Sequence, residues 1–406
     1  MPSPAVFRRR RQVVFGTASA MLLAVIFAVT TLVAPLPAAA VTLLDAPALT
    51  QPAAVLTLPG YGESAIAAEG FGTLATDGPQ EQVPIASITK VITALVILDA
   101  KPLADAADPG PTITFTQTDV QILQQTQAEL GSFEVVTNGM QLTQKQALTV
   151  MLMVSANNYA VSLATWAYGS FDSYLVAANT WLATRGLTDT VVDDASGISS
   201  GSRSTPADML TIGSLVMASP SLAEIVGTQT ADIPEIGAIR NGNQLLGTEG
   251  VNGIKTGTTL DAGATLLYSA VLQVGTQSVH VIGVTLGAET HAQLRDSVTA
   301  LLASVRASFH EVTVTTDGQT FGSAVTAWGA SADIASQESL TRVVFGDTPI
   351  IVTPVVSRVG SGGIGTVVGT LEISVGTESL SIPLDLTVAL DDPGAGWRLT
   401  HAGELF

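Results

Sequence analysis

The sequence predicts an α+β protein in which an antiparallel sheet flanked by helices, with a helical lobe, is followed by a smaller all-β domain. Three observations support this prediction. Helical patterns dominate the middle of the chain, from residue 85 to residue 184. Strand patterns separated by Gly-rich turns follow between residues 254 and 286. After Phe309 the helical signal ends, and short runs rich in Val, Ile and Thr recur.

Four helices are predicted in the middle of the chain. Residues 85–98 are apolar nearly all round and Pro102 follows them, which is typical of a buried helix that begins near Ser87. The other helical runs cover residues 142–154, 159–168 and 171–184. The segment Ser155-Ala156-Asn157-Asn158 interrupts the helical pattern between residues 154 and 159, so we expect a turn there.

Strands dominate the remainder of the chain. The first group covers residues 254–259, 264–274 and 278–286, and a helix at 291–305 is expected to pack on the sheet they form. The triplet Gly275-Thr276-Gln277 is typical of a hairpin turn. A second group covers residues 312–316, 350–359, 366–375 and 380–390. This group predicts a separate C-terminal β domain at residues 309–406.

The composition indicates folded domains that do not bind nucleic acid. Of the 406 residues, 47% are hydrophobic and 12% are charged, so the chain can bury sizeable cores. Its 16 basic and 34 acidic residues give a net charge of −18, which opposes binding to a polyanion. The chain has no cysteine, so its stability must come from packing rather than from disulfides.

The N-terminus has the features of an export signal. Arg8–Arg11 precede an apolar run from Met21 to Val33, and residues 35–40 have the small-residue spacing of a signal-peptidase site. Residues 13–34 are also long enough to cross a bilayer uncleaved, which needs roughly 20 residues. Cleavage after Ala40 is slightly favoured, so residues 1–40 are interpreted as a signal peptide or an N-terminal membrane anchor. Either way, we expect an exported protein at the outer face of the cytoplasmic membrane, in the cell wall or outside the cell.

The chain has only four lysines, at positions 90, 101, 145 and 255, and the sequence around them indicates the candidate catalytic residues. Lys90 follows Ser87 by three residues, a spacing that places amine and hydroxyl on one face of a helix. Lys255 begins Lys-Thr-Gly, and Ser155-Ala156-Asn157 lies between the two. Each motif alone is weak. Together and in this order, Ser-x-x-Lys, Ser-x-Asn and Lys-Thr-Gly are the motif set of penicillin-recognising serine enzymes.

The sequence around these motifs resembles the low-molecular-mass penicillin-binding proteins that are serine-type D-alanyl-D-alanine carboxypeptidases of the peptidase S11 family, particularly those of actinobacterial type. The resemblance covers about residues 65 to 305 and, more loosely, the β domain through Trp397-Arg398-Leu399. The segments that carry it are residues 85–94, 155–160, 194–198 with 204–208 in the loop after the second motif, and 241–263. It implies a penicillin-binding/β-lactamase-like catalytic domain at residues 41–308.

The resemblance also implies the catalytic roles of four residues. Ser87 would be the nucleophile that attacks the carbonyl between two D-alanines. Lys90 would be its base, provided that burial and the charge of Lys255 keep it partly neutral. Ser155 would relay a proton to the leaving amine, and the amide of Asn157 would hold both Lys90 and the substrate.

Substrate binding would fall to the Lys-Thr-Gly strand. Lys255 and Thr256 would bind the free carboxylate of the terminal D-alanine, and Arg295 offers a second positive charge. Gly257 would leave the strand edge open to the substrate backbone. Family geometry implies an oxyanion hole made by the backbone N–H groups of Ser87 and Thr258, assisted by the N-terminus of the Ser87 helix.

The expected function is removal of the terminal D-alanine from peptidoglycan stem pentapeptides, with β-lactams as covalent inhibitors. No cofactor or metal is expected, since the four histidines are scattered. A D,D-endopeptidase would use the same residues and stays open. A class A β-lactamase is disfavoured, because position 156 is Ala and no glutamate occurs between Asn158 and Ile198. The non-enzyme alternative is an inactive exported module that binds cell-wall peptide.

Overall fold

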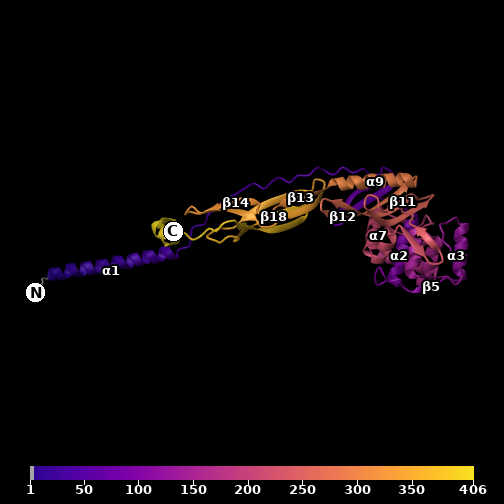
Figure 1. Ribbon diagram of the computed structural model, residues 1–406, viewed down its shortest axis with the longest axis horizontal. Helices are drawn as coiled ribbons and strands as arrows, with labels where there is room; N and C mark the ends of the chain where they lie inside the picture. The colour runs from indigo at the N-terminus through magenta and orange to yellow at the C-terminus, as the bar shows by residue number, and fades with distance from the viewer. Residues whose placement is uncertain (1–3) are drawn as a thin grey trace. The chain divides into compact units, whose positions relative to one another are not determined.

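The structure is a computed structural model that describes residues 4–406, and the chain divides into two compact units (Figure 1). The central unit comprises Ala54–Phe309. The terminal unit combines both ends of the chain, Met1–Ala53 and His310–Phe406. The sequence predicts a catalytic domain that begins at residue 41. In the structure residues 40–53 belong to the terminal unit instead, because Ala40–Leu43 form a strand of its sheet.

The central unit is built on a five-stranded antiparallel sheet with the strand order β10-β11-β12-β2-β3. The strands are β2 (Glu63–Ala68), β3 (Gly72–Asp77), β10 (Val251–Thr259), β11 (Gly263–Val274) and β12 (Gln277–Ala288). The last three confirm the strands and the hairpin expected between residues 254 and 286. Because β10 is an edge strand, one of its sides has no strand partner within the sheet.

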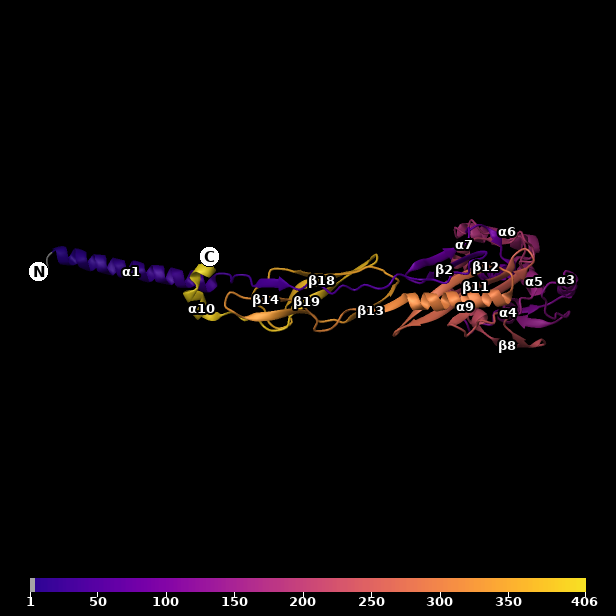
Figure 2. The same ribbon diagram turned by 90° about the horizontal axis from the view of Figure 1, so that it is seen from above.

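Helices cover both faces of this sheet. The helices of the central unit are α2 (Thr89–Ala100), α3 (Gln117–Ala128), α4 (Gln144–Met153), α5 (Asn157–Tyr168), α6 (Phe171–Thr184), α7 (Pro206–Ala218), α8 (Pro220–Gly227) and α9 (His291–Ser308). The sheet lies between α7 and α9 in both ribbon views (Figure 1, Figure 2). Helices α2 to α6 form the expected lobe, and short pairs of strands complete the unit: β4 (Val83–Pro84) with β7 (Arg203–Ser204), β5 (Thr112–Thr114) with β6 (Gln141–Thr143), and β8 (Thr230–Ile233) with β9 (Gly237–Arg240).

Helix α2 is the centre of the lobe. Every residue from Thr89 to Ile97 is buried, as the all-round apolar pattern predicts. The helix packs against α4, α5, α6 and α7. One turn of 3₁₀ helix, η1 (Ala86–Ile88), precedes it and contacts β10. The core therefore fixes Ser87 at the N-terminal end of α2, next to the open edge of the sheet.

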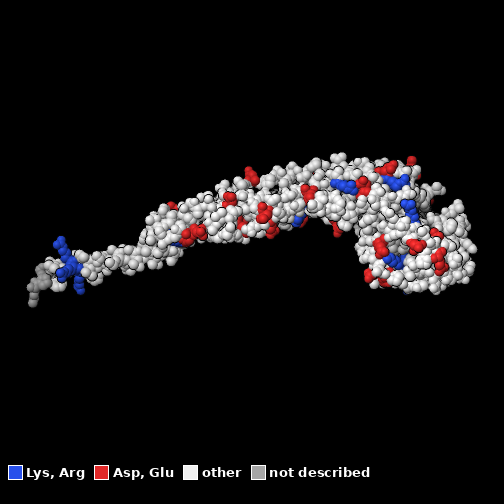
Figure 3. Space-filling view, in the orientation of Figure 1, with Lys and Arg blue, Asp and Glu red and all other residues white. Residues whose placement is uncertain are grey.

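The terminal unit is a β domain with an N-terminal helix. Its six-stranded sheet has the order β1-β14-β15-β19-β18-β17, and β13 pairs with β16. The elements are α1 (Pro4–Val33), β1 (Ala40–Leu43), β13 (Phe309–Thr315), β14 (Thr320–Val325), β15 (Ser331–Ser336), β16 (Leu340–Phe345), β17 (Ile350–Val356), β18 (Val367–Val375), β19 (Glu378–Leu386), α10 (Gly394–Thr400) and η2 (Ala402–Glu404). Helix α1 bears a basic cluster near its N-terminal end and is otherwise uncharged (Figure 3). Helix α10 was not expected from the sequence.

Candidate active site

Ser87 and Lys90 are in direct contact. Lys90 Nζ lies 2.9 Å from Ser87 Oγ and donates a second hydrogen bond, of 2.7 Å, to the backbone carbonyl of Ser196. The lysine side chain is completely buried, whereas Ser87 is partly accessible. The three-residue spacing thus brings amine and hydroxyl together as expected.

The surroundings of Lys90 favour a neutral amine. Burial lowers its pKa well below the ordinary value, the nearby charge of Lys255 lowers it further, and the carboxylate of Asp194 acts in the opposite direction. A neutral amine at 2.9 Å is able to accept the proton of the Ser87 hydroxyl. The contact therefore has the geometry and the electrostatics of a nucleophile paired with its base.

A loop after α6 holds the second partner of Lys90. The carboxylate of Asp194 accepts hydrogen bonds from the backbone N–H groups of Ser196, Gly197 and Ile198 and from the hydroxyl of Ser202. Gly197 has φ +79°, and a Cβ on it would lie 1.8 Å from the carbonyl oxygen of Ala86. Only glycine fits this close approach. Asp194 therefore positions Ser196 against Lys90, a role the sequence analysis did not assign.

The Ser-x-Asn motif lies at the turn between α4 and α5, as expected. Ser155 has φ +63°, which is uncommon for a residue with a side chain, and Asn157 begins α5. The backbone N–H of Asn157 donates to Ser132 O at 2.7 Å, and Asn158 bonds both backbone polar groups of Glu134. These contacts tie Ser132 and Glu134 to the motif.

Not every side chain of the three motifs is hydrogen-bonded to Lys90 in the structure. Among the described residues 4–406, the hydrogen bonds of Lys90 Nζ run to Ser87 and Ser196, and none runs to Ser155 or Asn157. The hydrogen bond between Lys90 and the Asn157 amide that the resemblance implies is therefore not formed among these residues, and the second hydrogen bond of Lys90 runs to the Ser196 carbonyl instead.

The Lys-Thr-Gly strand lies against the Ser87 turn. A Cβ on Gly257 would be 2.8 Å from the backbone nitrogen of Ser87 and 2.6 Å from Thr265 Oγ1. Lys255 is 3% exposed, donates to Thr256 O at 2.9 Å, and has a pKa that burial lowers to about 7. Gly257 thus permits the closest approach of β10 to the nucleophile.

A cavity of about 290 Å³ opens beside the strand. Thr256 from β10 and three residues of α9, His291, Leu294 and Arg295, contribute to its wall. His291 Nε2 lies 2.5 Å from Thr258 Oγ1. Burial lowers the pKa of His291, and the charges of Arg295 and Lys255 lower it further. Arg295, from which a second positive charge for the substrate carboxylate is expected, thus lines the same cavity as Thr256, and His291, for which the sequence predicts no role, lines it too.

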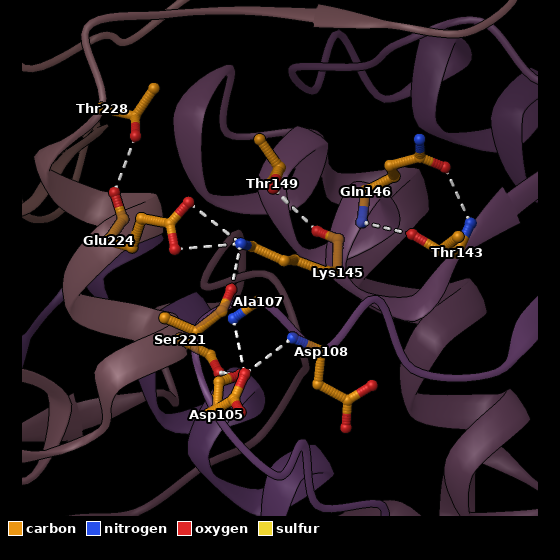
Figure 4. A network of polar contacts seen from close by, with 11 residues as sticks. Asp105, Ala107, Asp108, Thr143, Lys145, Gln146, Thr149, Ser221, Glu224 and Thr228 are labelled. Carbon is orange, nitrogen blue, oxygen red and sulfur yellow. Dashed lines mark hydrogen bonds and ion pairs between the residues drawn. The ribbon is translucent and has the colours of Figure 1, made fainter.

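The other two lysines lie in different surroundings. Lys145, from α4, forms an ion pair with Glu224 of α8 at 2.9 Å (Figure 4). Its amine also donates a hydrogen bond to the carbonyl of Ala106. Lys101 Nζ lies 5.9 Å from the centre of the Trp166 ring. Both are structural contacts on the lobe. Within residues 4–406, no group of three or more His, Asp or Glu side chains is arranged to hold a metal ion.

Comparison with known proteins decides the family. The sequence profile of peptidase S11, described as D-alanyl-D-alanine carboxypeptidase, matches residues 65–290, more than half of the chain. The chain belongs to the peptidase S11 family. The match contains all three motifs and the loop that positions Ser196.

The individual proteins that the chain resembles are more distant. The chain is 29% identical over 210 residues to a D-alanyl-D-alanine endopeptidase of Pseudomonas aeruginosa, covering 49% of this chain and 63% of that protein. It is 28% identical over 276 residues to the D-alanyl-D-alanine carboxypeptidase DacC of Escherichia coli, covering 64% of this chain and 62% of the relative. The chain thus spans less than two thirds of the length of either relative.

Solved structures show the same penicillin-binding-protein fold. A peptidoglycan synthesis regulatory factor, PBP3, from Streptococcus pneumoniae superposes with a TM-score of 0.58 at 18% identity, covering 83% of this chain and all of that chain. Penicillin binding protein 5 from Haemophilus influenzae gives 0.57 at 18% identity, covering 85% of this chain and 99% of that one. Both matches are longer than the central unit, which agrees with the expected α+β fold followed by a β domain.

Proposed function

We propose that this S11 protein is a serine D,D-carboxypeptidase that removes the terminal D-alanine from peptidoglycan stem peptides. The observation that carries the proposal is the contact between Ser87 and the buried Lys90. The family supports the substrate class. The export signal supports action outside the cytoplasm, on the outer face of the membrane or in the wall.

Acylation begins with proton transfer. Lys90 accepts the proton of Ser87, and Oγ attacks the carbonyl carbon of the penultimate D-alanine. The N–H groups of Ser87 and Thr258 stabilise the negative charge on the carbonyl oxygen. As the C–N bond breaks, Ser155 gives its hydroxyl proton to the leaving amine and takes up the proton that Lys90 holds, so Lys90 becomes neutral again and free D-alanine departs. A water molecule then attacks the ester while Lys90 accepts one of its protons, and Lys90 passes this proton to Ser87 Oγ as the ester C–O bond breaks.

Substrate recognition uses the edge of the sheet. An extended peptide is able to pair with the open side of β10, with Gly257 letting its backbone approach Ser87. The terminal carboxylate then lies near Thr256 and Arg295 in the cavity wall and near Lys255, whose charge acts on His291 of the same wall as that of Arg295 does. A β-lactam carries a similar carboxylate beside a strained amide, so it acylates Ser87 in the same way and inhibits the enzyme.

The direct test is product analysis. A synthetic stem pentapeptide and a cross-linked dimer are incubated with the protein, and released D-alanine and monomeric peptides are quantified by chromatography. We expect D-alanine from the pentapeptide. Cleavage of the dimer alone would favour the endopeptidase, an activity named for one relative. If neither substrate is cleaved, the better explanation is the inactive exported module that binds cell-wall peptide.

Substituting Gly257 with alanine is expected to slow acylation of Ser87 by about 10²-fold, the usual penalty for a displacement of roughly 1 Å at a reacting group. The added Cβ would lie 2.8 Å from the Ser87 nitrogen, so strand or turn must move. The measurement is the second-order rate of labelling by a fluorescent penicillin. Gly360→Ala is the matched control, since a Cβ there meets no atom within 4 Å. Equal rates for the two variants would show that β10 does not align the nucleophile.

The affinity for carboxylate-ended peptides is expected to weaken as the pH rises. Lys255 has a pKa of about 7, so it is cationic below that pH and neutral above it. A carboxylate binds the cationic form, and KM should therefore rise roughly tenfold between about pH 6.5 and pH 8. Steady-state kinetics across this range measure the change. A pentapeptide with a C-terminal amide is the control, and the same rise for both substrates would contradict a role for Lys255 in carboxylate binding.

A further inference from the structure

The N-terminal segment is built into the fold of the terminal unit. The N–H of Ala39 donates to Val359 O at 2.8 Å, and its side chain is 8% exposed in the core of the β domain. From Ala40 to Leu43 the chain pairs with β14, in the register Ala40 with Val325. Signal-peptidase cleavage after Ala40 would remove the first of these contacts and cut into the strand. The folded unit thus uses residues that a cleaved leader would take away.

The end of α1 is also held by the C-terminal helix. Arg398 of α10 donates from Nη1 to the carbonyl of Ala34 at 2.6 Å, and Nη2 forms an ion pair of 2.6 Å with Asp392. A basic side chain bonded to the last carbonyls of a helix stabilises its C-terminus. Thr31 and Ala34 are 0% and 6% exposed, whereas the 18-residue apolar window of α1 is 0% buried. The terminal unit therefore covers the last turn of α1 and leaves its apolar remainder open.

Aromatic residues gather at this junction. Trp397 of α10 stacks on His401 with ring centroids 5.0 Å apart, and Trp328 meets Trp397 edge-on at 5.7 Å. Two apolar residues at the C-terminal end of the chain, Leu399 and Phe406, are 39% and 82% exposed. Tryptophan is enriched where protein meets the lipid headgroups, because its ring is apolar and its N–H is polar. Both rings are half-buried, and the Nε1 of Trp328 is buried without a hydrogen-bond partner, so Trp397 is the tryptophan able to present its N–H to the headgroups.

The length of α1 fits this placement. Residues 12–31 span about 30 Å at about 1.5 Å per residue, which is the thickness of a bilayer core. Arg8–Arg11 then lie on the cytoplasmic side, and α10 reaches the outer interface. The uncovered apolar surface of α1 thus has an occupant of matching length and chemistry, the lipid bilayer.

We propose that the N-terminal segment is retained as a membrane anchor, and that Trp397, packed against Trp328, rests on the outer lipid interface. Retention preserves the contacts of Ala34 and Ala39, and the aromatic cluster sets the depth at which the β domain meets the membrane. The proposal concerns the terminal unit and does not depend on the activity of the central unit.

Retention is tested on the full chain expressed in a bacterium with its own export pathway. Intact mass and N-terminal peptide mapping are measured on the membrane fraction after an alkaline carbonate wash. We expect the uncleaved chain, still in the membrane. A mature N-terminus at Val41, or release by carbonate, would overturn retention.

The interface is tested by fluorescence quenching in nanodiscs that contain brominated lipids. The chain has four tryptophans, so a Trp328→Phe/Trp397→Phe double variant is compared with a matched Trp166→Phe/Trp181→Phe variant of the central unit. Quenching should persist in the second variant and fall at least severalfold in the first, with both folded by circular dichroism. Equal quenching in the two variants would overturn the interfacial placement.

Discussion

Replacement of Ser87 by alanine should abolish both D-alanine release and covalent labelling by penicillin, and we expect each rate to fall by at least about 10³-fold. The reason is that no other hydroxyl replaces Ser87 Oγ as the nucleophile of acyl transfer. Ser87 lies in a 3₁₀ turn, and its hydroxyl contacts Lys90 Nζ at 2.9 Å. Ser155 is the next serine of the motifs, but it has no hydrogen bond to Lys90. Turnover is measured by D-alanine release and labelling by gel fluorescence.

The control for this variant is its fold. Removing a partly accessible hydroxyl creates no large cavity, so the melting temperature of Ser87→Ala should equal that of the parent within about 2 °C. Labelling that survives in Ser87→Ala at the parent's rate would mean that another residue is acylated.

Replacement of Lys90 by methionine should lower the acylation rate by about 10³-fold, within the range that general bases contribute. Methionine keeps the apolar contacts of the lysine stem but is unable to accept the Ser87 proton. The measurement is the acylation rate against pH. In the parent the rate should rise as Lys90 loses its proton, at a pH well below the ordinary lysine pKa, because burial and Lys255 lower that pKa. In Lys90→Met this rise should disappear.

Lys145→Met is the matched control, because Lys145 is a lysine of the same lobe whose partners are Glu224 and the Ala106 carbonyl. Its half-exposed ion pair contributes little to stability, at most about 1 kcal/mol, and its acylation rate should be unchanged. If the acylation rate of Lys90→Met still rises with pH over the same range as in the parent, a group other than Lys90 is the base.

The elements that carry the motifs are predictable because their patterns are local. Residues 85–98 are apolar all round, and the structure buries α2 on every side. Strand β10 carries the Lys-Thr-Gly motif, and β11 and β12 follow it as adjacent runs with tight turns, so their pairing is also local. Spacing alone brings Ser87 to Lys90, since both belong to one helical turn.

Other elements escape the sequence patterns for physical reasons. Strand β2 lacks alternation, since Glu63 and Ser64 are buried at its start, and its partner β12 lies more than 200 residues away. Helix α3 is polar, with only Leu123 and Thr126 buried, so it has no apolar stripe to detect. Helix α10 contains glycines and depends on its packing against α1. In α7 a usable signal exists, because Thr205 caps the helix and Pro206 begins it.

The active-site residues that were missed act through space rather than through a motif. The partner of Lys90 at Ser196 is a backbone carbonyl 106 residues away, and any residue type supplies such a group. His291 reaches Thr258 across 33 residues, from the first turn of α9 to β10. A lone histidine at a helix start gives no signal until the strand beside it is known.

The most direct test of the account is intact-mass analysis of the full-length protein in detergent, followed over time after mixing with benzylpenicillin, with peptide mapping of the product. The account predicts one added penicilloyl group, located on Ser87 and stable for minutes or longer. An adduct on another residue, or no adduct, would contradict the assignment of the nucleophile. An adduct on Ser87 that hydrolyses within seconds would contradict the carboxypeptidase and favour a β-lactamase.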